Sequence, residues 1–159
     1  MLVGKWHWVW AAGAFAALGA TSVGAAGLSL QTDTPKRKRS VRDGVYTEAQ
    51  AKQGEEQYSY YCGACHISDL QGDSVQDVPA LAGDDFLASW EKRSVGELFE
   101  VVSKTMPKDS PASLDAKTYG EILSYILQAN KFPAGAVELV AQSDRLDQIV
   151  IEGPPNAQK

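Results

Sequence analysis

The sequence predicts an all-α domain, and two kinds of pattern support this. Apolar side chains recur at helical spacing, most clearly in the series Tyr119, Ile122, Leu123, Ile126 and Leu127. Helix-start signals precede two apolar segments, because Thr47 and Ser94 are each followed three residues later by Gln or Glu, the pattern of a capping box. The length of 159 residues suggests one domain with additional terminal segments.

Four short helices are expected. They begin at Thr47, at Asp84 or Asp85, at Ser94 and at Asp115, and the last ends near Ala129. Their expected core residues include Tyr58, Tyr61, Phe86, Leu87, Trp90, Val95, Leu98, Phe99, Val101, Val102 and Tyr125. Gly54, in the first helix, is predicted to be a contact between crossing helices rather than a point of flexibility.

The composition excludes several classes of protein. Two cysteines cannot form a disulfide-dense scaffold or a four-thiolate metal site. The net charge of −5 argues against a nucleic-acid partner, which would require a basic face. The charge is also unevenly distributed, since residues 6–32 are uncharged, residues 36–42 are basic, and the part from Val45 onward carries nine Lys and Arg against 18 Asp and Glu.

These differences divide the chain into four expected segments. Residues 1–26 have the apolar centre and small-residue end of a cleaved signal peptide. An uncleaved anchor formed by residues 6–32 is the alternative, since about 20 apolar residues cross a bilayer. Residues 27–44 are expected to form a basic flexible tether, residues 45–140 the domain, and residues 141–159 a C-terminal tail.

The pentapeptide Cys62-Gly63-Ala64-Cys65-His66 is the signature of covalent c-type haem attachment. Two thiols at this spacing add to the two vinyl groups on one haem edge, and the imidazole of the next residue then lies under the iron. A thioredoxin-like dithiol would require a preceding strand, whereas a helix is expected here. A zinc site would require further Cys or His ligands, which the chain after the signal peptide does not contain.

The rarity of histidine and methionine in the sequence suggests which residues are the axial ligands of the haem iron. His7 lies in the signal segment, so His66 is the only histidine of the domain. Met106 is the only internal methionine, and Pro107 beside it favours a loop. A lone methionine often fills a gap in a core, but His/Met is a standard axial pair in electron-transfer haem proteins. We therefore predict His66 and Met106 as metal ligands.

The chain resembles the class I bacterial cytochromes c over about residues 45–139. The resemblance rests on four motifs in order, namely Gly54-x-x-x-Tyr58-x-x-x-Cys62-x-x-Cys65-His66, Pro79-Ala80-Leu81-Ala82-Gly83, Thr105-Met106-Pro107, and Tyr119-x-x-Ile122-Leu-Ser-Tyr125-Ile126-Leu127. It implies four to five short helices wrapped around one haem c, which is bound covalently through Cys62 and Cys65. It also implies that the Pro79 carbonyl accepts a bond from the proximal imidazole. The segment Asn130-x-x-Pro133-Ala-Gly135 resembles a subgroup found with periplasmic quinoprotein dehydrogenases.

The expected cofactor-binding residues are Cys62, Cys65, His66, Pro79, Leu81, Trp90 and Met106. Trp90 is either a donor to a haem propionate or a core residue, and the sequence leaves both open. The resemblance implies a periplasmic, non-enzymatic electron carrier. Its donor would be a periplasmic dehydrogenase and its acceptor a terminal oxidase or another cytochrome, and the N-terminal segment could associate with a membrane. The alternatives are a haem subunit of a dehydrogenase complex and a haem-based ligand sensor with an open or labile distal position.

Overall fold

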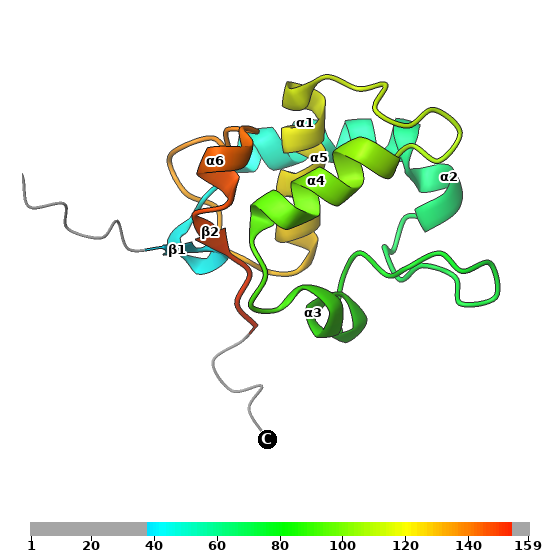
Figure 1. Ribbon diagram of the computed structural model, residues 1–159, viewed down its shortest axis with the longest axis horizontal. Helices are drawn as coiled ribbons and strands as arrows, with labels where there is room; N and C mark the ends of the chain where they lie inside the picture. The colour runs from blue at the N-terminus through cyan, green and yellow to red at the C-terminus, as the bar shows by residue number, and fades with distance from the viewer. Residues whose placement is uncertain (1–37, 154–159) are drawn as a thin grey trace, which may run out of the picture. The chain divides into compact units, whose positions relative to one another are not determined.

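The computed structural model describes residues 38–153 (Figure 1), so the expected signal peptide or anchor, most of the tether and the last six residues lie outside it. Its elements are β1 (Arg39–Ser40), the 3₁₀ helix η1 (Val41–Asp43), α1 (Glu48–Tyr61), α2 (Gly63–His66), α3 (Asp84–Trp90), α4 (Val95–Thr105), α5 (Ala116–Ala129), α6 (Ser143–Leu146) and β2 (Ile149–Val150). The predicted all-α fold is confirmed, with one small two-stranded sheet added. In this part of the chain, no helix has the length and apolar character needed to cross a membrane.

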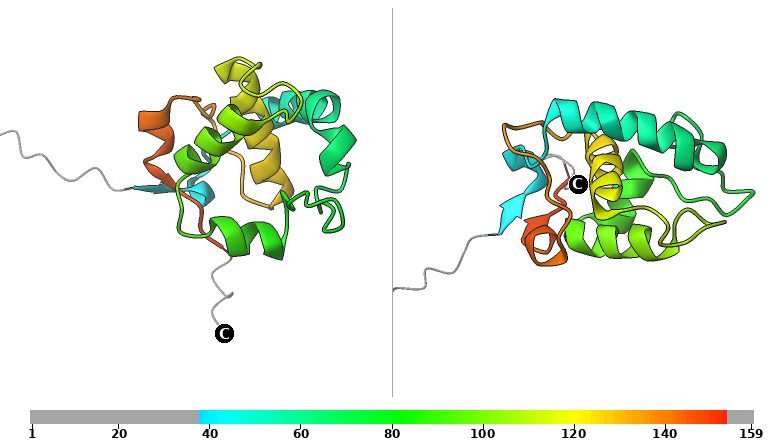
Figure 2. Two further views of the ribbon diagram at one scale, coloured as in Figure 1. Left: turned by 45° about the vertical axis from the view of Figure 1, so that its right-hand side comes forward. Right: turned by 90° about the horizontal axis from the view of Figure 1, so that it is seen from above.

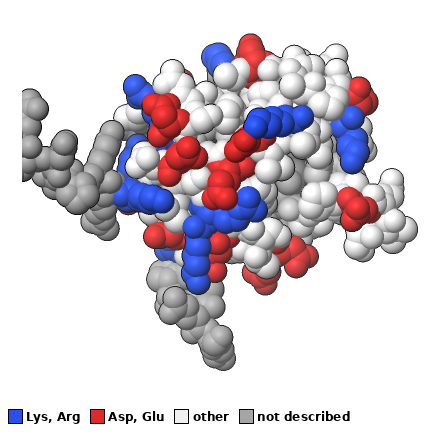
Figure 3. Space-filling model, viewed as in Figure 1, with Lys and Arg blue, Asp and Glu red and all other residues white. Residues whose placement is uncertain are grey.

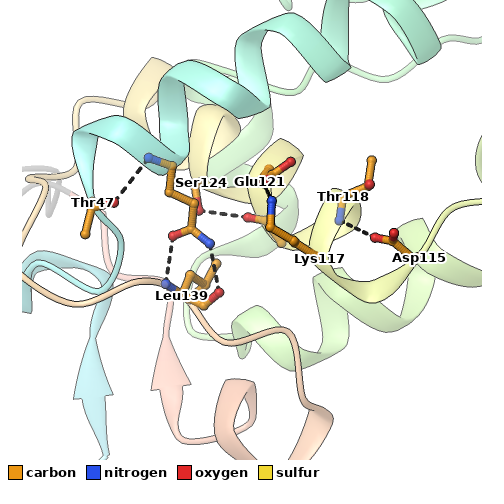
Figure 4. A network of polar contacts seen from close by, with 9 residues as sticks. Thr47, Asp115, Lys117, Thr118, Glu121, Ser124 and Leu139 are labelled. Carbon is orange, nitrogen blue, oxygen red and sulfur yellow. Dashed lines mark hydrogen bonds and ion pairs between the residues drawn. The ribbon is translucent and has the colours of Figure 1, made fainter.

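Side-chain caps explain where three of the helices begin. The Ser94 hydroxyl and the Glu97 carboxylate form the complete capping box at α4, and the Asp115 carboxylate accepts the Thr118 N–H at α5. At α1, Thr47 accepts the Gln50 N–H, but the predicted reciprocal half of the box is absent. The buried Gln50 amide instead donates to the Leu139 carbonyl oxygen at 2.9 Å and accepts the Leu139 N–H at 2.8 Å (Figure 4), so it ties α1 to the segment after α5.

Two long helices, α1 and α5, cross at the centre of the domain (Figure 2). Gly54 lies at the crossing, where a Cβ atom would be only 1.8 Å from the Glu121 carbonyl oxygen of α5. Only a residue without a side chain permits this approach. The prediction that Gly54 is a crossing contact is therefore confirmed.

The folded unit is wider than the expected domain at residues 45–140. Strand β1 pairs in parallel with β2, with Arg39 opposite Ile149, and Val41 of η1 is fully buried. Residues 39–44 are thus not a free tether. Much of the expected tail is also folded, since α6 and β2 lie beside α4 and β1 (Figure 1). The side chains of Leu146, Ile149 and Ile151 are buried in the hydrophobic core.

Candidate functional site

A cavity of about 520 Å³ opens between the end of α1, α2, α3, α4 and α5. All seven predicted site residues line it: Cys62, Cys65, His66, Pro79, Leu81, Trp90 and Met106. Most of the remaining lining residues are apolar, and α4 and α5 contribute five of them: Leu98, Val101, Val102, Ile122 and Ile126. Its size is that of a site for a cofactor-sized ligand.

The cysteine motif forms a single helical turn at the end of α1. The Cys62 N–H closes α1 by donating to the Tyr58 carbonyl oxygen at 2.8 Å, and the Cys62 carbonyl oxygen then accepts the N–H of Cys65 at 3.1 Å and of His66 at 2.9 Å. This turn places both thiols on one wall of the cavity, with Cys62 half-buried and Cys65 exposed. Burial, with a smaller contribution from the charge of Cys65, raises the pKa of the Cys62 thiol to about 11. The preceding helix contrasts with the strand that a thioredoxin-like dithiol would require.

His66 is buried, and its ring orientation is fixed by a backbone carbonyl. Its Nδ1 lies 3.2 Å from the Pro79 carbonyl oxygen, the contact that the family resemblance implied. When Nδ1–H donates there, Nε2 keeps its lone pair for a metal. Burial lowers the pKa of the His66 imidazole, and the bond to Pro79 only partly opposes this, so the neutral ring is favoured.

The loop that carries Pro79 is held at both ends. The Leu70 carbonyl oxygen accepts the Leu81 N–H at 2.8 Å. The Asn130 side chain donates to the Leu81 carbonyl oxygen at 2.9 Å and accepts the Gly83 N–H at 3.0 Å. Asn130 follows α5, so this one amide ties the Pro79 loop to that helix. The sequence placed Asn130 in a subgroup motif but gave no indication of this contact.

Met106 follows the last residue of α4 and lines the cavity. Its N–H donates to the Val102 carbonyl oxygen at 2.9 Å, the last backbone bond of the helix. Its own carbonyl oxygen accepts the hydroxyl of Tyr119 from α5 at 2.7 Å. Helical spacing marked Tyr119 only as an apolar-face residue, so the sequence did not reveal this bond.

The rim of the cavity carries aromatic residues. Trp90 is half-buried at the end of α3, and the Arg93 guanidinium carbon lies 4.2 Å from its ring centroid. Tyr60, which is 80% exposed, packs edge-on against Tyr61 with centroids 4.7 Å apart. Both tyrosines line the cavity mouth. Helical placement predicts Tyr61 as a packing residue, and no pattern in the sequence marks Tyr60.

The donor set fits a c-type haem. Two thiols three positions apart, an imidazole with a free Nε2 and a thioether face one apolar cavity, and these are the groups that attach and ligate such a haem. Within residues 38–153, no group of three or more His, Cys, Asp or Glu side chains is placed to hold a metal ion.

Comparison with known families gives an independent result. A family model described as cytochrome C oxidase, cbb3-type, subunit III matches residues 49–126. The match begins in α1 and ends in α5, and it includes all seven predicted site residues. Neither the curated proteins nor the solved structures contain a match.

Proposed function

We propose that this protein, which belongs through residues 49–126 to the class I c-type cytochromes, carries single electrons on a haem whose iron is ligated by His66 and Met106. The family implies a covalent c-type haem and is typical of electron carriers rather than enzymes. One observation supports the ligand assignment above all. The only histidine and the only methionine of residues 38–153 line the same cavity as the two thiols.

Each part of the site has a role in this proposal. Cys62 and Cys65 hold the haem through thioether bonds, and the bound haem supplies the ferric/ferrous couple. The Pro79 carbonyl oxygen fixes the His66 ring and increases its basicity as a ligand. The apolar side chains from α4 and α5 keep water from the iron, which limits reorganisation when the charge changes. Trp90 is placed at the rim, where its indole N–H would serve a haem propionate.

The partners we propose are redox proteins that dock at the cavity mouth. Exposed Tyr60, Tyr61 and Val101 line this mouth, and on the face of Figure 3 much of the surface on the α2 side lacks charged groups. The described part is acidic as a whole, so a partner with a basic patch would be attracted to it over long range. A periplasmic dehydrogenase as donor and a terminal oxidase or another cytochrome as acceptor are our candidates.

Periplasmic location completes the proposal. Residues 1–26 would direct export as a signal peptide, or residues 6–32 would remain as an anchor. The alternative of a haem subunit held permanently by a dehydrogenase would use the tether or the tail as its interaction segment. It is less favoured, because Val41 of the tether and Leu146 and Ile149 of the tail are buried in the protein's own core. The sensor alternative requires Met106 to be absent from the iron or to leave it easily.

The Met106→Ala variant of the exported holoprotein tests the ligand assignment. We expect wild-type oxidised protein to show a Met-to-iron charge-transfer band and reduced protein to exclude carbon monoxide. Met106→Ala should lose the band and bind carbon monoxide. Val101→Ala, which shortens another side chain of the same cavity without removing a donor atom, is the matched control and should keep both wild-type properties.

Two results would contradict the proposal. The first is carbon monoxide binding by the wild type as tight as by Met106→Ala, which would favour the sensor alternative. The second is an exported protein without covalent haem, with both thiols free by mass spectrometry. Electrostatic docking is tested separately by the electron-transfer rate with a basic partner, which should fall as ionic strength rises.

A further inference from the structure

Three buried tyrosines donate their hydroxyl to a backbone carbonyl oxygen. Tyr46 donates to Phe132 at 2.6 Å, Tyr58 to Ile67 at 2.7 Å, and Tyr119 to Met106 at 2.7 Å. Only the bond of Tyr119 ends on a residue that lines the cavity, since Phe132 and Ile67 do not. Tyr119 itself is 3% exposed and lies outside the cavity lining, so it acts on the cavity only through Met106.

We propose that Tyr119 is a positioning residue that holds Met106 on the iron and thereby keeps external ligands away. This inference rests on the proposed ligation by Met106. It goes further by naming the group that decides how firmly the distal position is closed.

The local structure shows why one hydrogen bond would matter here. Met106 is the residue at which α4 ends, and the following Pro107 has no N–H with which to continue the helix. Residues 107–113 after it are largely exposed. The Met106 carbonyl oxygen is thus the point where the departing chain is tied back to α5.

The position of Tyr119 is fixed in turn. The Asp115 carboxylate caps the start of α5 one turn earlier. On its other side, the Phe99 ring from α4 packs edge-on against Tyr119 with centroids 6.4 Å apart. The hydroxyl is therefore presented by a rigid ring at a fixed place, which lowers the entropic cost of the bond.

Release of Met106 from the iron by movement of its backbone segment would break the bond to Tyr119. The state with Met106 on the iron is therefore favoured over the released state by the net free energy of one buried hydrogen bond. The released state would also leave a buried hydroxyl or carbonyl group unpaired. Removing the hydroxyl should raise the population of the released state about tenfold. The apparent affinity for an external ligand rises by the same factor, because it is proportional to that population.

The test uses purified holoprotein and imidazole as the external ligand of the ferric iron. Tyr119→Phe removes one oxygen atom and should bind imidazole about tenfold more tightly than the wild type. Tyr46→Phe is the matched control, since it loses the same kind of bond from a residue that is 1% exposed and does not line the cavity. It should lose stability but bind imidazole as the wild type does.

Equal imidazole affinity in Tyr119→Phe and Tyr46→Phe would overturn the inference. Should Tyr119→Phe not yield folded protein, Phe99→Leu loosens the same tyrosine without removing its hydroxyl. An increase in imidazole affinity would then support the inference, and wild-type affinity would overturn it. Met106→Ala tests ligation by Met106 separately from its positioning by Tyr119. If it binds imidazole far more tightly than the wild type, ligation by Met106 stands whatever Tyr119 does, and if it binds equally, the ligand assignment itself fails.

Discussion

Replacement of Gly54 by alanine should separate the two helices on which the site is built. The added Cβ would lie 1.8 Å from the Glu121 carbonyl oxygen and 2.5 Å from its carbonyl carbon. Both are backbone atoms of α5, so no side-chain rotation relieves the contact. Normal contact begins near 3.4 Å, which means that the helices must move apart by about 1.5 Å at the crossing.

Two opposing terms set the magnitude. Overpacking of this kind costs about 1–3 kcal/mol, and a rigid backbone neighbour places this site at about the upper end. Alanine in place of glycine within a helix returns about 1 kcal/mol. We therefore expect Gly54→Ala to lower the free energy of unfolding by about 2 kcal/mol.

Guanidinium unfolding of the holoprotein, followed by circular dichroism, measures this loss. Gly63→Ala is the matched control, because its Cβ would meet only the Tyr58 carbonyl oxygen at 3.6 Å, an ordinary contact. Because Gly63 lies in α2 and its Cβ meets no overpacked neighbour, this variant should unfold at or slightly above the wild-type denaturant concentration. If Gly54→Ala also unfolds there, with an unchanged dependence on denaturant, the close approach of the two helices is not a requirement of the fold.

Three further predictions concern the supports of the site. Asn130→Ala removes a side chain that joins the Pro79 loop to α5. We expect it to lower the free energy of unfolding by about 2–3 kcal/mol in the same guanidinium assay, and a decrease below about 0.5 kcal/mol would contradict this. Gly96→Ala would place a Cβ 2.0 Å from Asp147 Oδ1 and push the segment around Asp147 away from α4. Amide hydrogen exchange should therefore accelerate in residues 143–151 while α5 stays protected. Equal acceleration throughout the domain would show that the effect is not local. The Thr118 N–H lowers the pKa of Asp115, so the charged cap stabilises α5 above the ordinary carboxyl pKa and this contribution is lost as pH falls through the lowered pKa. Thermal unfolding of the wild type and of Asp115→Asn is compared from neutral pH to about pH 3. The difference between their melting temperatures should shrink only below about pH 4, and a difference that stays constant over this range would refute the role of the charged cap.

The parts of the site that the sequence predicted are those whose chemistry is local. The cysteine motif fixes two thiols and an imidazole within five consecutive residues, and the structure presents them on one helical turn. Met106, which its scarcity and its following proline marked in the sequence, lines the same cavity. The capping box at Ser94 was also predictable, since both of its partners lie within one turn.

The contacts that the sequence did not predict join residues that are far apart along the chain. Gln50 fits a capping box, yet its amide bonds to Leu139, because a buried backbone segment offers it both a donor and an acceptor. The pairing of Arg39 with Ile149 involves strands of two residues each, too short to give an alternating pattern. Helical spacing locates Tyr119 on an apolar face but carries no information about its hydroxyl.

The helix α5 connects these unpredicted contacts to the proposed chemistry. Near its start, Tyr119 bonds to the carbonyl of Met106, and just after its end Asn130 bonds to the loop of Pro79. These two residues are 11 positions apart, which at the rise of an α-helix is about 16 Å. The supports of the two proposed ligands are therefore held at a separation that the length of one helix determines. The helix α5 also crosses α1 at Gly54. A shift of α5 would therefore move Met106 and the Pro79 loop together relative to the cysteine turn at the end of α1. The crossing thus couples the stability of the fold to the geometry of the proposed ligands.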